Sequence, residues 1–300
     1  MHMIKNYRIH QQQGLGVLTA QSKIIDSPRG MIEYADRGDG SAVLISHGSF
    51  GGFDQGLASV YFLEEFKNRF IAPSRFGYLR TPMPLDATPQ AQATAYAALL
   101  DRLAIEKVWL IGLSAGGMSA LHFVRQFPAR CHGLILISAV SRPMTVPAPV
   151  RFMVEHILTN EFLGWLLVTY LPSLVARSTG DDYTLVADNP LLKETFLKLA
   201  WPQHAPLRKA GMLNDLRQSD SMAGFKYEDI IVPTLLIHGT ADPMVPFNQT
   251  EQLAARIKGA RLLTFHKGGH LSFLTHQDET KAALRNFMDI RSEGQPPDEG

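Results

Sequence analysis

The chain has little of several features that mark specialised classes of protein. It contains one cysteine among its 300 residues, Cys131, so no disulfide can form within it. No Cys/His cluster has the spacing of metal ligands, and we expect neither a metal nor another cofactor. The formal net charge is +1 and no run of Lys and Arg reaches four, so the basic footprint of nucleic-acid binding is missing.

Long apolar runs are also missing. The longest, FLGWLLVTYL at 162–171, is well short of the roughly twenty residues that span a bilayer. The first twenty residues lack the apolar core of a secretory signal. The sequence therefore predicts a cytoplasmic protein without a membrane span, and it carries no signal for an oligomeric state.

The sequence does contain strand and helix patterns in alternation. Continuous apolar runs predict buried strands, and apolar residues at helical spacing lie between several of them. Such alternation indicates an α/β fold with a mostly parallel, doubly wound sheet covered on both faces. The strands are expected as a pair around a turn within 31–48 and then at 69–73, 108–113, 133–140, 234–239 and 261–266, with helices at 88–104, 115–127, 251–259 and 278–290.

The alternation breaks in the middle of the chain. Between 145 and 228 no strand is evident, and Leu, Trp, Phe and Met recur at helical spacing between prolines. We interpret this stretch as a helical cap inserted into a core made of 22–144 and 229–291. The polar, Pro- and Gly-containing end, 292–300, is expected to be disordered.

The strand at 108–113 ends at a serine set among glycines. GLSAG, residues 112–116, is a G-x-S-x-G sequence with a strand before it and a helix after it. Gly112 and Gly116 lack the β-carbons that would collide in such a sharp turn, and Ser114 would be pushed outward. We therefore predict Ser114 to be a nucleophile; the alternative is an incidental serine in a glycine-rich turn.

A serine hydroxyl needs a base and a group that orients the base. His270, in the loop HKGGHLSF after the strand at 261–266, is our candidate base. His266 is its rival but ends that strand and is expected to be packed, and His238 is expected to be structural. Asp242 follows the strand at 234–239 and completes the chain order Ser, Asp, His expected of this triad.

An oxyanion hole requires two backbone N–H groups that point at the oxygen gaining charge. Ala115, directly after the nucleophile, is expected to supply one. The other is expected from the glycine-rich loop HGSFGG at 47–52, where Ser49 is the first choice and Phe50 the second. A plain glycine cluster is the alternative reading of that loop.

Taken in order, HGSFGG, GLSAGG, HGTADPMVP and GGH resemble the α/β-hydrolase fold family over about residues 22–290. The segment SRFGYLRTP, 74–82, departs from the family pattern because Phe76 and Leu79 replace small residues. The resemblance implies a helical lid at 145–228. It also implies attack of Ser114 on a carbonyl, with His270 as base, Asp242 orienting it, and an acyl-enzyme that water releases.

The leading hypothesis is hydrolysis of a small ester, lactone or thioester that carries an apolar part. The predicted cap offers an apolar stripe for it, made of Phe162, Trp165, Leu166, Leu167 and Tyr170. Carbon–carbon bond hydrolysis, perhydrolysis and aminopeptidase activity keep the same triad. For a peptidase, the cap would supply acidic residues, namely Glu155, Glu161, Asp181 and Asp182. A ligand receptor with little turnover and a non-catalytic scaffold are the alternatives from other classes.

Overall fold

The computed structural model describes residues 7, 15–16, 18–63, 66–144, 146–201 and 204–292. Within these ranges the strands form a single sheet in the order β1-β2-β4-β3-β5-β6-β7-β8. The strands are β1 Lys23–Ser27, β2 Gly30–Arg37, β3 Ser41–Ser46, β4 Asn68–Pro73, β5 Val108–Leu113, β6 Cys131–Ile137, β7 Thr234–Gly239 and β8 Arg261–Phe265.

Strand direction changes only near the first edge of the sheet. β1 pairs antiparallel with β2, and β2 pairs antiparallel with β4, whereas every later pairing from β4 to β8 is parallel. The two strands expected around a turn within 31–48 both exist, but they are not neighbours. β4 lies between them: β3 pairs in parallel with β4 on one side and with β5 on the other, and β2 pairs with the far edge of β4.

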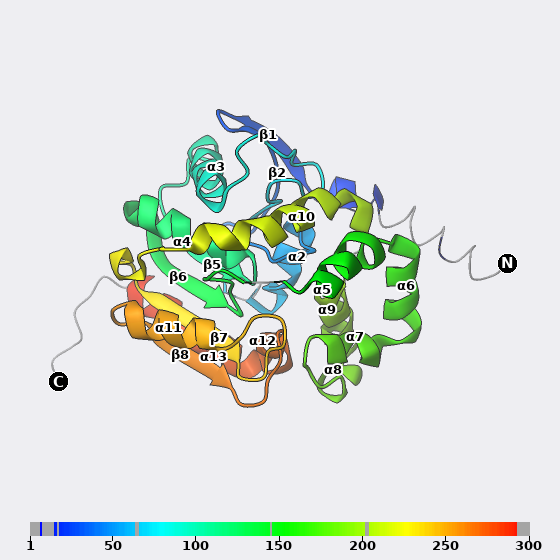
Figure 1. Ribbon diagram of the computed structural model, residues 1–300. Coiled ribbons are helices and arrows are strands. Elements are labelled where there is room, and N and C mark those ends of the chain that lie inside the picture. The colour runs from blue at the N-terminus through cyan, green and yellow to red at the C-terminus, as the bar shows by residue number, and fades with distance from the viewer. Residues whose placement is uncertain are drawn as a thin grey trace.

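The helices occupy both faces of the sheet and a separate cluster. The core helices are α2 Phe53–Ala58, α3 Pro89–Arg102, α4 Gly116–Gln126, α11 Asn248–Arg256, α12 Ser272–Thr275 and α13 Gln277–Ser292. We use the name cap for six further helices and the segments that join them. These cap helices are α5 Ala148–Met153, α6 Glu161–Tyr170, α7 Pro172–Ser178, α8 Thr184–Ala187, α9 Pro190–Ala200 and α10 Lys209–Gln218. In Figure 1, α5 to α9 gather on one side of the molecule, and α10 runs back toward α4.

Alternating side chains of the parallel strands build a buried cluster on each face of the sheet. On β5, Leu110 belongs to the cluster that contains Leu121 of α4 on one face, whereas Ile111 belongs to the cluster that contains Leu284 of α13 on the other. A strand buried on both faces has no polar positions to spare, which explains its continuous apolar run. The predicted α/β class, with a mostly parallel sheet covered on both faces, is confirmed.

One predicted strand is less buried than its sequence suggests. β8 lies at the edge of the sheet and pairs only with β7, so Leu262 is 41% exposed. His266, expected to be packed at the end of this strand, is exposed. An apolar run alone does not distinguish an edge strand from a central one. Strand β1 was not predicted, because its side chains are mostly exposed and form no apolar run.

The middle of the chain is helical, as expected from its pattern. The described residues between 146 and 222 contain helices and no strand. The division into a core of 22–144 and 229–291 and a cap of 145–228 stays our proposal. Most of the tail predicted to be disordered, 293–300, lies outside the described residues.

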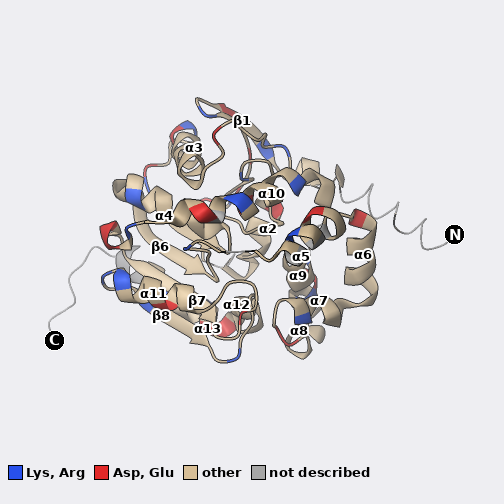
Figure 2. Cartoon of the chain, in the orientation of Figure 1, with Lys and Arg blue, Asp and Glu red and all other residues tan. Residues whose placement is uncertain are grey.

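Charged residues are dispersed over the molecule. Basic and acidic residues are interspersed along the helices rather than gathered on one side (Figure 2). In the part of the chain that the structure describes, no helix combines the length and the apolar character that crossing a membrane requires.

Candidate active site

Ser114 lies in a tight turn between β5 and α4, with Ala115 between it and the helix. Its φ of 47° is in the left-handed region, which costs an L-residue about 1–2 kcal/mol. The turn is held on both sides: the Ser114 N–H donates to the Ile137 carbonyl (3.0 Å), and the Ser114 carbonyl accepts from the Val140 N–H (2.8 Å). Backbone strain of this kind persists where the surroundings impose it.

The glycines on either side of Ser114 are required by their neighbours. A β-carbon on Gly116 would lie 2.1 Å from the carbonyl oxygen of Ser46, at the end of β3. A β-carbon on Gly112 would lie 2.7 Å from the β-carbon of Ala120 on α4. From the sequence, we expected β-carbons at these two positions to collide with each other. In the structure, Gly116 instead allows the end of β3 to approach the turn, and Gly112 allows α4 to pack against β5.

His270 and Asp242 meet as the sequence analysis expected. Nδ1 of His270, in the loop between β8 and α12, lies 2.7 Å from Oδ2 of Asp242 in the loop after β7. Both residues are buried. Since the carboxylate can only accept, Nδ1 carries the proton, and Nε2 of the neutral imidazole is left to act as an acceptor.

The Asp242 carboxylate is fully engaged. Oδ1 accepts from the backbone N–H groups of Met244 (2.8 Å) and Val245 (3.0 Å), and Oδ2 also meets Nε2 of His238 at 2.9 Å. Burial alone would raise the pKa of the Asp242 carboxyl. The charge of His270 and the hydrogen bonds from His238, His270 and Val245 outweigh burial and hold that pKa well below its usual range.

His238, expected only to be structural, is therefore a partner of the candidate acid. Its Nε2 faces two acceptors, Oδ2 of Asp242 and the carbonyl of Val245, and so carries the proton. Its Nδ1 lies 2.5 Å from the hydroxyl of Thr250, which then donates. The sequence signal was present in HGTAD, where His238 stands four residues before Asp242 at the end of the same strand.

The charges around His270 favour its protonated form. Burial lowers the pKa of the imidazole, but the charge and hydrogen bond of Asp242 and the charge of Asp181 outweigh burial, so the pKa of His270 is raised. Ser114 and His270 line the same cavity. Among the described residues the Ser114 hydroxyl makes no hydrogen bond to the imidazole, and such bonds are often long until a substrate is bound.

The loop after β3 contributes residues to the lining of this cavity. Gly51 N–H closes a turn onto the Gly48 carbonyl (3.2 Å), and Phe50 in that turn has a φ of 64°. Ser49 and Phe50 both line the cavity, and within the described residues neither backbone N–H donates to a protein acceptor. Ala115, the other expected donor, follows Ser114 but lies along a second, smaller cavity.

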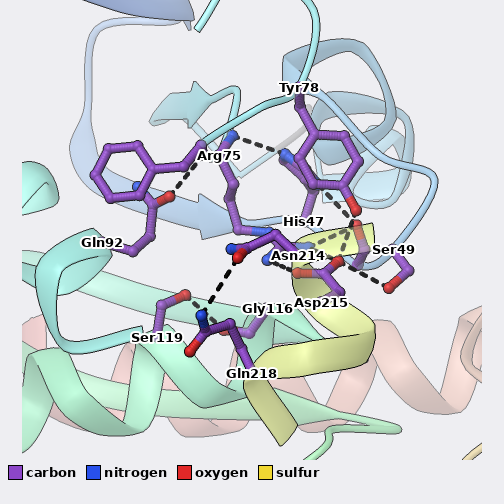
Figure 3. Close-up of polar contacts among 12 residues, drawn as sticks. His47, Ser49, Arg75, Tyr78, Gln92, Gly116, Ser119, Asn214, Asp215 and Gln218 are labelled. Atoms are coloured by element: carbon purple, nitrogen blue, oxygen red, sulfur yellow. Dashed lines mark hydrogen bonds and ion pairs between the residues drawn. The ribbon is translucent and has the colours of Figure 1, made fainter. Parts of the chain in front are cut away.

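A buried ion pair anchors this loop to the cap. The carboxylate of Asp215 on α10 accepts hydrogen bonds from both terminal nitrogens of Arg75, each at 2.7 Å. It also accepts from the hydroxyls of Ser49 (2.8 Å) and Tyr78 (2.6 Å). Arg75 also donates to the Gly48 carbonyl at 3.1 Å. Figure 3 shows these side chains converging on Asp215 from the core, so the position of the loop depends on a cap residue.

The segment 74–82 keeps a tight backbone despite its departures from the family pattern. Leu79, where the family has a small residue, adopts a left-handed φ of 53°, and its N–H donates to the Leu207 carbonyl of the cap (2.7 Å). Phe76 is buried in the core. The bulky residues are therefore accommodated, and Leu79 joins the core to the cap.

The cavity beside Ser114 encloses about 620 Å³, including its open mouth. Most of its lining is apolar, and the cap contributes Thr179, Leu199 and Ala200. The stripe on α6 that was expected to face the pocket is not part of this lining. Phe162 and Trp165 pack against Tyr7 instead. The apolar wall exists, but it comes from α9 and the strand ends rather than from α6.

Two polar side chains at α2 interrupt the apolar lining: Gln55 within the helix and Ser59 directly after it. Gln55 and Ser59 are both buried and both line the cavity. The Gln55 amide nitrogen donates to the Lys198 carbonyl at 2.6 Å, which fixes the orientation of the amide. Among the described residues, the Gln55 side-chain oxygen accepts no hydrogen bond, so an acceptor remains for a group in the cavity.

The combination of a strained serine after a strand, a histidine paired with a buried carboxylate and free backbone donors is typical of enzymes that transfer acyl groups. The chain belongs to the alpha/beta hydrolase family, whose model matches residues 42–283.

Similar proteins cover nearly the whole chain. It is 28% identical to the uncharacterized hydrolase YcgS of Bacillus subtilis, over 87% of this chain and 95% of that protein. It is 26% identical to a 2-hydroxymuconate semialdehyde hydrolase of Pseudomonas putida, over 84% and 89%. A solved alpha/beta hydrolase fold protein from Nakamurella multipartita superposes with a TM-score of 0.79 at 28% identity, over 91% and 100%.

Proposed function

We propose that this hydrolase acts on a small ester, lactone or thioester through a covalent acyl-enzyme, with Ser114, His270 and Asp242 as its catalytic triad. The observation that carries the proposal is the pairing of His270 with Asp242 beside a cavity that also contains Ser114. A serine favours acyl transfer over attack on alkyl halides or epoxides, because alkylated serine would be a stable ether.

The proposed reaction uses each group in turn. Nε2 of His270 takes the proton of Ser114 as its oxygen attacks the carbonyl carbon, and Asp242 stabilises the imidazolium. Backbone N–H groups of Ala115 and of Ser49 or Phe50 hold the oxyanion. The leaving group takes the proton from His270. Water then attacks the acyl-enzyme with His270 again as base, releasing the acid and freeing Ser114.

The lining supports a substrate with an apolar body and one polar group. Leu113, Ile137, Leu199 and Phe273 offer apolar surface, and the free acceptor of Gln55 suits a hydroxyl or amide donor. The acidic cap residues considered for a peptidase give less support, because none of them lines the cavity. Asp181 instead contacts the loop that carries His270.

The test is a fluorophosphonate probe together with p-nitrophenyl esters of graded acyl length, a lactone and an amide. We expect the wild type to be labelled and to turn over short or medium esters, and Ser114→Ala to lose both. Ser221→Ala, an exposed serine of the cap, is the matched control and should behave as wild type. Labelling without turnover would favour a ligand receptor, and no labelling would overturn the proposal.

A second candidate is hydrolysis of a carbon–carbon bond in a dione, with the same triad acting on a ketone. The similarity to a 2-hydroxymuconate semialdehyde hydrolase favours it. Including a dione in the substrate screen separates the two candidates. A dione kcat/KM at least tenfold above that for every ester would replace the ester assignment while leaving the proposed triad in place.

A further inference from the structure

The loop that carries His270 is held by the cap as well as by the core. The His270 N–H donates to the carbonyl of Thr179 at 2.7 Å, and the Leu271 N–H donates to Oδ2 of Asp181 at 2.9 Å. Thr179 and Asp181 belong to the loop between α7 and α8. On the core side, the Ser138 hydroxyl donates to the His270 carbonyl at 2.8 Å. Cap and core thus fix the backbone on both sides of the imidazole.

The two loops touch backbone to backbone. A β-carbon on Gly269 would lie 2.4 Å from the Thr179 carbonyl oxygen and 2.7 Å from the Asp181 nitrogen. Gly180 has a φ of 77°, and a β-carbon there would lie 2.7 Å from Cδ of Pro243, next to Asp242. Glycine at both positions permits the cap loop to sit against both the histidine loop and the aspartate loop.

Asp181 brings a second carboxylate to the surroundings of His270. Its side chain is buried, and burial raises the pKa of the carboxyl even though the Leu271 N–H and the Thr179 hydroxyl favour the charged form. The titratable groups that bear on the imidazole are therefore Asp242 from the loop after β7, His238 behind Asp242, and Asp181 from the cap. Of these, only Asp181 comes from outside the core.

We propose that Asp181 is a positioning residue for His270: its carboxylate holds the histidine loop through the Leu271 N–H and stabilises the imidazolium that forms when His270 takes a proton. This inference rests on the proposed function for its catalytic consequence. Under this proposal the cap supports the catalytic base, in addition to lining the cavity. A buried carboxylate near a developing positive charge is a favourable arrangement, because the interior screens charge weakly.

Two substitutions separate the hydrogen bond from the charge. Asp181→Asn keeps an oxygen that can accept from Leu271 but removes the charge, and Asp181→Ala removes both. We expect kcat of Asp181→Ala on the best ester to fall about tenfold, the size of the loss of one hydrogen bond to a charged group. Asp181→Asn should lose less in kcat. The acid limb of its kcat/KM profile should lie at lower pH than that of the wild type, because the imidazolium has lost a stabilising charge.

The matched control is Asp182→Asn. Asp182 is exposed and lies in the same cap loop, where its Oδ1 accepts from the Thr184 N–H at 2.9 Å. Among the residues that the structure describes, it makes no hydrogen bond to the histidine loop. We expect wild-type kcat and an unmoved pH profile for this variant. If Asp181→Asn and Asp181→Ala lowered the melting temperature but left kcat and the pH profile at wild-type values, the role would be structural and the proposal would fall.

An NMR titration of the His270 imidazole tests the same inference without turnover. The His270 resonance is assigned by its loss in His270→Gln, and the titration is repeated in Asp181→Asn and Asp182→Asn. We expect the pKa of His270 to fall in Asp181→Asn only. An unchanged value in that variant overturns the positioning role, even if the enzyme proves active. A shifted value in a chain that hydrolyses no carbonyl substrate would overturn the proposed function alone.

Discussion

The hydroxyl of Ser49 donates to the carboxylate of Asp215 at 2.8 Å, joining residues 166 positions apart in the chain. Ser49 lies in the loop that lines the cavity and that we propose as a donor of N–H groups to the oxyanion, and Asp215 lies on cap helix α10. The same carboxylate neutralises the buried guanidinium of Arg75, which in turn holds the carbonyl of Gly48. A charged cap residue therefore fixes the geometry of the candidate oxyanion loop, and this relationship can be tested directly.

Asp215→Asn should be strongly destabilising. The substitution leaves the Arg75 guanidinium buried without a counter-charge, and breaking a buried pair in this way costs about 3–5 kcal/mol. Urea unfolding followed by tryptophan fluorescence measures the loss. Asp220→Asn, an exposed acidic residue just after α10, is the control and should unfold as wild type does. Equal midpoints for the two variants would contradict the anchoring role of the pair.

Asp242→Asn should lower kcat by about 10³-fold or more, because the amide no longer enforces the tautomer of His270 that presents a free Nε2. A fluorophosphonate should still label Ser114 in this variant, but more slowly than in the wild type. The comparison is Asp278→Asn, an exposed acid in the first turn of α13, which should keep wild-type kcat. Full activity in Asp242→Asn would mean that another group orients the base.

The acid limb of the pH profile should have its midpoint above the ordinary histidine pKa of about 6.5. The raised pKa of His270 means that the imidazole is protonated, and cannot accept a proton, over a wider range of low pH. The same shift stabilises the fold below the ordinary pKa of imidazole, and that contribution is lost as pH rises through the raised value. A pH profile of kcat/KM checks the first statement; an acid limb below 6.5 would argue against it.

His238→Leu should lower kcat about tenfold, because Asp242 loses one of the hydrogen bonds that hold it charged and in place. His238→Gln, which can still donate toward Asp242, should recover part of the loss. Steady-state kinetics at several pH values, with circular dichroism to verify folding, compares the two. The role assigned to His238 would be wrong if Leu and Gln gave the same kcat as wild type.

Gln55→Leu should change selectivity more than overall rate. Removing the free acceptor should lower kcat/KM about tenfold for an acyl chain that carries a hydroxyl, relative to the unsubstituted chain of equal length. Gln90→Leu, on the exposed side of α3, serves as the control. A uniform loss across both esters would indicate a packing defect at α2 rather than recognition.

Much of the core was predictable because its signals are local. Helix α3 begins where Thr88 caps it and Pro89 opens it, and the Thr88 hydroxyl accepts from the Ala91 N–H at 3.1 Å. The strands on either side of Ser114 in the chain could be predicted as buried, because strands covered on both faces have continuous apolar sequences. The position of β4 between β2 and β3 was not predictable, since nothing local distinguishes one order of strands from another.

The candidate site was predictable to the same extent. Ser114, Asp242 and His270 each follow a strand, and parallel strands end at one edge of a sheet. Asp215 was not recognised, and Asp181 was considered only as an acidic residue of a peptidase cap. Their partners lie 137–166 and 90 residues away in the chain, and no motif links them. For the same reason the α6 stripe was assigned to the pocket: helical spacing shows that a face is apolar, but the neighbour it meets depends on tertiary packing.

The backbone contact between Gly269 and the Thr179 carbonyl carries a consequence for protein engineering. A chimera that took its lid from another family member would place a foreign loop against a histidine segment shaped to receive this one. Grafted lids should therefore work only when residues 179–181 and Asp215 travel with them. Exchanging α6 alone, which lies away from both contacts, is the graft that this architecture should tolerate.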